Sequence, residues 1–279
     1  MESYFQVDAF ADQAFKGNSA GVIITESELS RELMQKIATQ NNLPATAFIW
    51  FTNSEFKLRW FTMKRELSLC GHATLASAHV LFSKGFVKIK NKIHFITGKG
   101  DLYAGIQNGW ITMDFPVSGF EPVEIPQNLR SLFSSKFRSG FQTEDRLLIE
   151  LTDEAAVRDF IPDMSILTEY KCIITAQADR GSPYDFVSRF FNMPDGISED
   201  AVTGSSHCSL APFWAARLGK KKLLAFQASL RGGELKLELD NQRVLISGQA
   251  VTVIEGKYLP LIQKALQNNL NLSSLRIDS

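Results

Sequence analysis

The chain has 279 residues, 44% hydrophobic and 22% charged, enough to bury one large core or two of ordinary size, and its composition excludes a disordered protein. Lys plus Arg and Asp plus Glu are equal at 30 each, which excludes the strong positive field of a nucleic-acid binder or of a protein drawn to anionic membranes. The start of the chain has no signal-peptide pattern, and no apolar stretch is long enough to cross a membrane. The odd set Cys70, Cys172 and Cys208 has no paired spacing, so we expect reduced thiols and a cytoplasmic protein.

Short strand patterns alternate with helical ones along the first part of the chain. The apolar spacing of Leu33, Met34 and Ile37 predicts a helix over 30–41, with Ser30 available as its N-cap. Strands are predicted where β-branched and aromatic residues are bounded by turn formers, at 4–9, 21–25, 47–51, 57–61, 93–106 and 110–115.

Two further segments predict helices of an unusual kind. Residues 73–82 carry no formal charge and are apolar or small on all sides, which is typical of a helix surrounded by protein; residues 208–218 are similar until Arg217. A proline-containing crossover is predicted over 115–131, and a last helix over 259–270.

These patterns predict an α+β fold of two pseudo-symmetric halves, each a curved, barrel-like sheet wrapped around a central helix. We place the halves at 1–116 and 117–279, the second with the crossover and the terminal helix.

A glycine motif occurs twice. Residues 69–74 read Leu-Cys-Gly-His-Ala-Thr and residues 202–207 read Val-Thr-Gly-Ser-Ser-His, which places Gly71 and Gly204 133 positions apart. The same offset relates Gly100 to Gly233 and Trp110-Ile111 to Arg243-Val244. Three landmarks with one offset indicate an internal duplication, in which two similar helix N-termini can face each other across a cleft.

A buried helix N-terminus leaves backbone N–H groups without partners and favours a small anionic ligand. At each repeated turn a glycine lets the backbone approach such a ligand, and a polar side chain follows, His72 in one half and Ser205 in the other. For a single copy, packing glycines and helix caps would be the better interpretation. The second copy at the same offset favours a ligand site.

Three more interpretations concern side chains at these turns. The helix dipole disfavours an imidazolium at His72, which predicts a neutral ring able to exchange a proton, although a histidine buried against a backbone carbonyl fits equally. Asp200 either orients this ring or a substrate amine, or only compensates a helix dipole. Cys70 either has a thiol pKa lowered by the helix N-terminus or is a small core residue.

No histidine or cysteine spacing typical of a metal site occurs, and neither does a glycine-rich nucleotide-binding loop. The remaining alternatives are cofactor-free proton chemistry and simple binding.

Several motifs together give the chain a family resemblance. The segments 7–10, 15–22, 58–62, 69–76, 199–205 and 227–233 occur in order and resemble the phenazine-biosynthesis PhzF family from near residue 4 to about residue 256. The resemblance implies the diaminopimelate-epimerase-like fold with the active site between the halves. It also implies a homodimer, no cofactor, and isomerisation of a small cyclic or amino acid by proton transfer.

Carried over by position, the resemblance places His72, Asp200 and Ser205 in the catalytic site. Gly71 and Gly204 offer backbone contacts there, and Thr203 and Asn18 are further substrate-binding candidates.

Ala45 departs from the family pattern, because the residues 42–48 read Asn-Leu-Pro-Ala-Thr-Ala-Phe and alanine stands where the family has a proton-shuttling glutamate. A methyl group does no acid–base work, and loss of such a group commonly lowers a rate roughly 10²- to 10⁴-fold. The alanine is an engineered knockout or, as Pro44 favours, natural divergence.

Two functional consequences of this change compete. His72, Asp200 or Cys70 has taken over as the base, or the protein is a silent metabolite-binding or protein-interaction member of the fold. In the related epimerases two cysteines act across the cleft at the repeated turns, and Thr203 takes the place of one of them here. The sequence therefore disfavours a two-thiol epimerase and favours an isomerase that uses His72.

Overall fold

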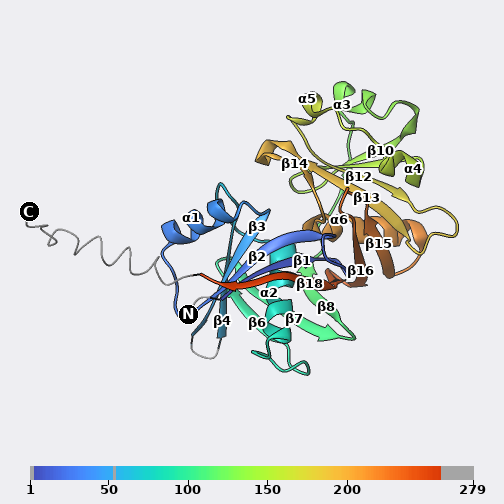
Figure 1. Cartoon of the computed structure of the whole chain (residues 1–279). Coiled ribbons are helices and arrows are strands. Elements are labelled where there is room, and N and C mark those ends of the chain that lie inside the picture. Colours follow the sequence, from blue (N-terminus) through green and yellow to red (C-terminus); the bar gives the residue numbers. More distant parts are fainter. Residues whose placement is uncertain (1–2, 53–54, 259–279) are drawn as a thin grey trace, which may run out of the picture.

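The computed structural model describes residues 3–52 and 55–258, which form two lobes joined side by side (Figure 1). The first lobe contains the strands β1 (Ser3–Ala9), β2 (Asn18–Thr25), β3 (Ala45–Thr52), β4 (Glu55–Phe61), β5 (Glu66–Leu67), β6 (Ile93–Thr97), β7 (Gly100–Gln107) and β8 (Trp110–Pro116). Its helices are α1 (Arg31–Asn41) and α2 (Gly71–Ser83).

The second lobe is built from the later part of the chain. Its strands are β9 (Glu121–Pro122), β10 (Phe137–Gln142), β11 (Leu147–Leu151), β12 (Lys171–Gln177), β13 (Phe186–Asn192), β14 (Ile197–Asp200), β15 (Lys222–Gln227), β16 (Gly233–Asp240) and β17 (Arg243–Gly248). Its helices are α3 (Gln127–Ser131), α4 (Glu154–Arg158), α5 (Met164–Leu167) and α6 (Gly204–Leu218), with 3₁₀ turns at Ser134–Lys136 and Met193–Asp195.

The strand pairings repeat from one lobe to the other. With β18 (Ala250–Lys257) included, the first lobe has the order β18-β1-β2-β3-β4-β6-β7-β8 and the second β9-β10-β11-β12-β13-β15-β16-β17. The parallel and antiparallel senses are the same at every step. The first residues of α2 and α6, of β7 and β16, and of β8 and β17 all keep the offset of 133 found in the sequence. The internal duplication and the predicted α+β class are therefore confirmed.

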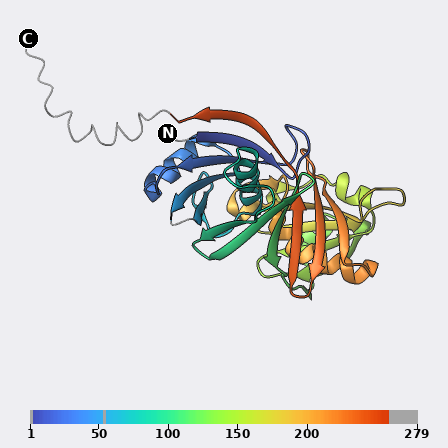
Figure 2. The ribbon, with the colours of Figure 1, turned by 90° about the horizontal axis from the view of Figure 1, so that it is seen from below.

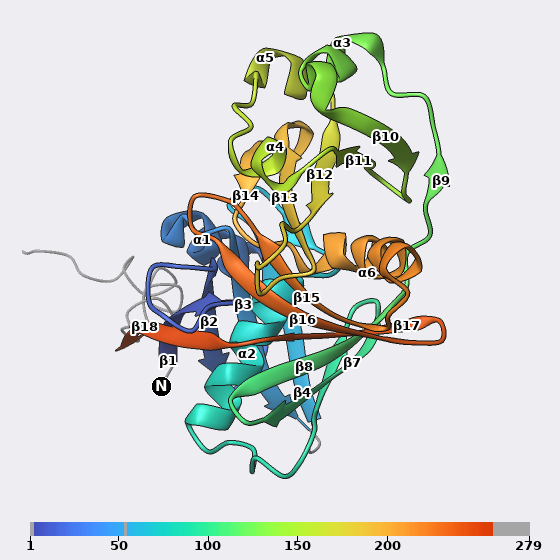
Figure 3. The ribbon, with the colours of Figure 1, turned by 90° about the vertical axis from the view of Figure 1, so that its right-hand side faces the viewer.

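One strand of each sheet is exchanged. The last described strand, β18 (Ala250–Lys257), pairs with β1 in the first lobe, while β9, which follows the first half, pairs with β10 in the second. Figures 1 and 2 show β18, the last described strand, beside β1, the first strand of the chain. The sheets are also joined directly, because β8 pairs with β17 from Ile111↔Gly248 to Pro116↔Arg243 (Figure 3).

Each central helix is buried, because a helix that is apolar or small on nearly all sides is stable only when protein surrounds it. Ten of the thirteen residues of α2 are buried, and small residues such as Ala73, Ala76 and Ala78 let the curved sheet approach on every side. α1 lies instead on the outer face of β3 and β4, where its apolar stripe packs on Phe48 and Phe61. Ser30 caps α1 as predicted, accepting a hydrogen bond from the backbone N–H of Leu33. The helix predicted over 259–270 lies outside the described residues.

Candidate active site

The two repeated glycine turns meet between the lobes. A Cβ atom built on Gly71 would lie 3.6 Å from Cα of Gly204, and one built on Gly204 would lie 3.7 Å from Cα of Gly71. The N-termini of α2 and α6 are therefore neighbours, each presenting backbone N–H groups without helical partners. The pair forms a local positive field suited to a carboxylate.

Asp200, the last residue of β14, connects the two lobes at this point. Its Oδ1 accepts a hydrogen bond of 2.7 Å from Nδ2 of Asn18, and its Oδ2 accepts one of 2.5 Å from Oγ1 of Thr203. Asn18 also donates to the carbonyl of Val202 at 2.9 Å. Asn18 and Thr203 thus position the Asp200 carboxylate by hydrogen bonds. Their contact with a substrate stays a prediction.

Gln227 belongs to the same network, a role that the sequence reasoning missed. Its Oε1 accepts from the backbone N–H of Thr203 at 2.8 Å, and its Nε2 donates to the carbonyl of Asp200 at 2.7 Å. The side chain is fully buried. Its one sequence signal was its place at the head of the segment 227–233 that carries the family resemblance.

His72 lies in the first turn of α2 and is 8% exposed. Burial lowers the pKa of His72, and the nearby Asp200 carboxylate raises it by a smaller amount. A neutral imidazole is therefore favoured at neutral pH, as predicted, but the main cause is burial.

Cys70 fits the core interpretation. Its Sγ lies 3.6 Å from Nδ1 of His72, and burial raises the pKa of the thiol to about 12. The proximity of the helix N-terminus does not offset the cost of desolvating a thiolate. Cys70 is thus unsuited to act as a thiolate base near neutral pH.

The three described cysteines should be inert in the native protein, because Cys70, Cys172 and Cys208 are all buried and burial raises the pKa of each to about 12. We expect negligible reaction with Ellman's reagent at pH 8 and release of three equivalents in guanidinium chloride. Rapid labelling of one thiol in the folded protein, absent from the Cys70→Ser variant, would contradict this account of Cys70.

Ser205 is exposed at the start of α6 and meets a cation that the sequence reasoning also missed. Nη1 of Arg146 lies 3.3 Å from Oγ of Ser205 and 3.1 Å from Oγ of Ser206. The guanidinium is ion-paired with Asp145 at 2.7 Å and lies over the ring of Phe190. No motif surrounds Arg146 in the sequence, so only the fold brings it to this helix end.

Ala45 is the first residue of β3 and is fully buried. It pairs in parallel register with Ala20, two residues after Asn18 on β2, so the side chains of these three residues share one face of the sheet. That face packs on α2 and carries the Asn18 amide to Asp200. Position 45 therefore lies on the face that leads into the candidate site.

His207, one turn into α6, gives the protein a predictable pH response. Its Nδ1 lies 2.9 Å from the carbonyl oxygen of Thr203, and burial lowers its pKa from 6.5 to about 4. The unfolded chain takes up this proton near pH 6.5 while the folded chain does not, so stability is lost as the pH falls from about 6.5 to about 4.

We expect this residue to account for roughly 3 kcal/mol of the free energy of unfolding lost over that interval. Urea unfolding across the interval, compared with His207→Asn, measures it. An equally steep pH dependence in the variant would show that His207 is not responsible.

The hollows of about 600 and 230 Å³ on the described surface are lined by neither His72 nor Asp200. Within residues 3–52 and 55–258, no group of three His, Cys, Asp or Glu side chains is arranged to hold a metal ion. The helices of the same ranges include none long and apolar enough to span a bilayer.

The two lobes and their facing glycine turns have the diaminopimelate-epimerase-like fold. A probable proline racemase from Agrobacterium radiobacter shares the fold at 9% identity, with a TM-score of 0.62 over 93% of each chain. A crystal structure of a phenazine biosynthesis protein of the PhzF family from Enterococcus faecalis matches at 38% identity, with a TM-score of 0.88 over 92% of this chain and 99% of that one.

The family follows from two further matches. The PhzC-PhzF model, described as phenazine biosynthesis-like protein, matches residues 7–256. A protein of Halalkalibacterium halodurans named as an uncharacterized isomerase is 38% identical over 264 residues, covering 91% of this chain and 97% of that protein. The chain belongs to the phenazine biosynthesis-like PhzC-PhzF family, as the sequence motifs indicated.

Proposed function

We propose that the protein is a cofactor-independent isomerase that moves a proton within a small cyclic or amino acid bound between the lobes. The observation that carries the proposal is the contact of Gly71 and Gly204, which places two helix N-termini next to the hydrogen-bonded Asp200. The names of relatives as isomerases support this reaction class. The homodimer implied by the resemblance and the cytoplasmic location expected from the cysteines stay predictions.

The proposed step needs no net reagent. The substrate carboxylate binds the backbone N–H groups of α2 and α6, which lowers the energy of the negative charge that develops when a neighbouring C–H bond breaks. Neutral His72 accepts that proton, and the imidazolium formed is stabilised by the Asp200 carboxylate. The imidazolium, which can exchange this proton with water, then protonates a different carbon of the substrate, which completes the isomerisation and allows solvent deuterium to enter the product.

Ala45 limits this chemistry. The family pattern has a carboxylic acid where this chain has the buried methyl group of Ala45. His72 is therefore the only acid–base group of the proposed step. We therefore propose slow turnover. The alternative is a silent member of the family that binds a metabolite or a protein, and the methyl group at position 45, which does no acid–base work, favours it.

Proton NMR in deuterated water over a panel of dihydroanthranilate-like acids and amino acids tests the proposal. We expect slow solvent exchange by the native protein, abolished in His72→Ala. The matched control is His79→Ala, seven residues along α2, where the ring contacts Thr252. Exchange that survives in His72→Ala would refute His72 as the base, and no exchange from the native protein or any variant would favour the silent alternative.

A further inference from the structure

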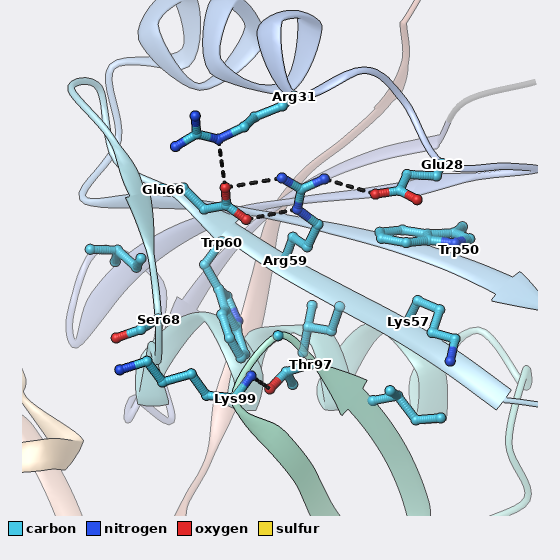
Figure 4. A pocket seen from close by; sticks show the side chains of 14 residues that line it. Glu28, Arg31, Trp50, Lys57, Arg59, Trp60, Glu66, Ser68, Thr97 and Lys99 are labelled. Atoms are coloured by element: carbon cyan, nitrogen blue, oxygen red, sulfur yellow. Dashed lines mark hydrogen bonds and ion pairs between the residues drawn. The ribbon is translucent and has the colours of Figure 1, made fainter.

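The larger hollow, of about 600 Å³, opens on the first lobe and has no part in the proposed reaction (Figure 4). It forms where the hydrogen-bonded neighbour of β4 changes. β4 pairs with β6 at Phe56 and Lys57 and with β5 at Trp60 and Phe61. Leu58 and Arg59 lie between these two sets of pairs. The sheet is therefore open at this point, between β5 and the turn that joins β6 to β7.

The acidic groups of this hollow are already neutralised. Glu66 accepts two hydrogen bonds from Arg59, at 2.7 and 3.0 Å, and a third from Arg31 at 2.8 Å. Glu28 pairs with the remaining side of Arg59 at 2.8 Å. Two arginines and two glutamates thus form a closed, neutral quartet along one wall (Figure 4).

The rest of the lining supplies hydrogen-bond donors in excess. The ammonium of Lys99 has no ion-pair partner among the described residues, and its side chain extends toward that of Ser68 in Figure 4. Lys57 lies at the other end of the hollow, with a long contact of 3.5 Å to Glu55. With the quartet neutral and Lys57 paired with Glu55, the hollow keeps the positive charge of Lys99.

The indole of Trp60 is a further donor without an acceptor. Trp60 is 1% exposed, and its Nε1 has no hydrogen-bond partner among the described residues. A buried donor left unpaired is unfavourable, and the neighbouring lysines and arginines have only donors to offer. Trp50, Leu58 and Ile96 complete the apolar part of the lining.

We propose that this hollow is a binding site for an aromatic carboxylic acid. The flat apolar body packs on the partly exposed Leu67 and Ile96, beside Trp50 and Trp60, and the carboxylate is held by Lys99 and Ser68 at one end. The volume lies within the range of small-molecule sites in proteins. The site is separate from the candidate active site and does not depend on the protein being an isomerase.

Titration with 2-naphthoate, followed through the indole N–H resonances of the ¹⁵N-labelled full chain, tests the proposal. The four tryptophans provide built-in controls, because Trp50 and Trp60 line the hollow while Trp110 and Trp214 do not. Trp60→Phe assigns the Trp60 resonance. We expect saturable shifts of Trp50 and Trp60, little change in Trp110 and Trp214, and no saturable shift with the neutral 2-naphthalenemethanol.

Lys99→Met keeps the aliphatic stem and removes the charge, and we expect it to raise the apparent Kd for 2-naphthoate about tenfold. Lys90→Met is the matched control, since Lys90 is also exposed but lies outside the hollow. Equal weakening by the two variants, equal binding of the neutral alcohol, or shifts confined to Trp110 and Trp214 would overturn the proposal. An unmoved Trp60 resonance with saturating 2-naphthoate would overturn it as well.

Discussion

Replacing Ala45 by glutamate should raise the rate of proton exchange on a substrate acid by roughly 10²- to 10⁴-fold. Position 45 is fully buried, on the sheet face that carries Asn18 to Asp200. Desolvation would raise the pKa of a glutamate placed there toward neutrality, which suits a group that must both take and give a proton. Deuterium incorporation followed by NMR measures the gain.

Ala45→Gln is the matched control for this prediction. It adds a side chain of nearly the same volume with no proton to exchange, so it separates acid–base chemistry from changes in packing. We expect it to remain at or below the native rate, with thermal unfolding measured to show that both variants fold. Equal rates in the two variants would contradict the assignment of position 45 as the missing acid–base group.

The second large effect is expected at Gly17, at the junction of the lobes. Its N–H donates to the carbonyl of Gly232 at 2.7 Å, and its own carbonyl accepts from Nε of Arg231 at 2.7 Å. Its φ is +63°, and a Cβ built on it would lie 2.1 Å from the carbonyl oxygen of Ala9. Gly17→Ala therefore combines left-handed backbone strain with a clash against rigid backbone, for a loss of roughly 4 kcal/mol.

Gly85 provides the control, because its φ is +75° but no atom lies within 4 Å of a Cβ built there. Gly85→Ala should cost only about 1 kcal/mol, the strain of the left-handed conformation alone. Urea unfolding of both variants measures the difference. Equal losses would show that the contact of Gly17 with Ala9 is not what makes this position sensitive.

The duplication was predictable because it leaves a trace in the linear sequence, as glycine turns with one offset. Both central helices could also be predicted, since α2 carries no formal charge and α6 carries none before Arg217, so each must be enclosed by protein. The exchange of β18 and β9 between the sheets was not predictable. It depends on pairings between distant segments such as Ala9↔Ala250, and nothing in the local pattern of either strand specifies its partner.

The same distinction holds for the site. Gly71, Gly204, His72 and Asp200 stand in repeated or family-like motifs, and the structure brings the glycines into contact. Arg146 reaches Ser205 from a loop 59 residues away, without any motif of its own. The helix N-terminus beside Cys70 suggested a lowered thiol pKa, but burial raises that pKa, and only the packed structure reveals the burial.

The central claim is that the two helix N-termini bind one substrate carboxylate together. Its most direct test is a titration of the ¹⁵N-labelled protein with an acid that undergoes exchange, following the backbone amides of Gly71 and Gly204. We predict that both resonances shift and saturate with the same Kd, because one ligand contacts both turns. Unchanged glycine amides at saturating substrate, or different Kd values for the two, would contradict the claim.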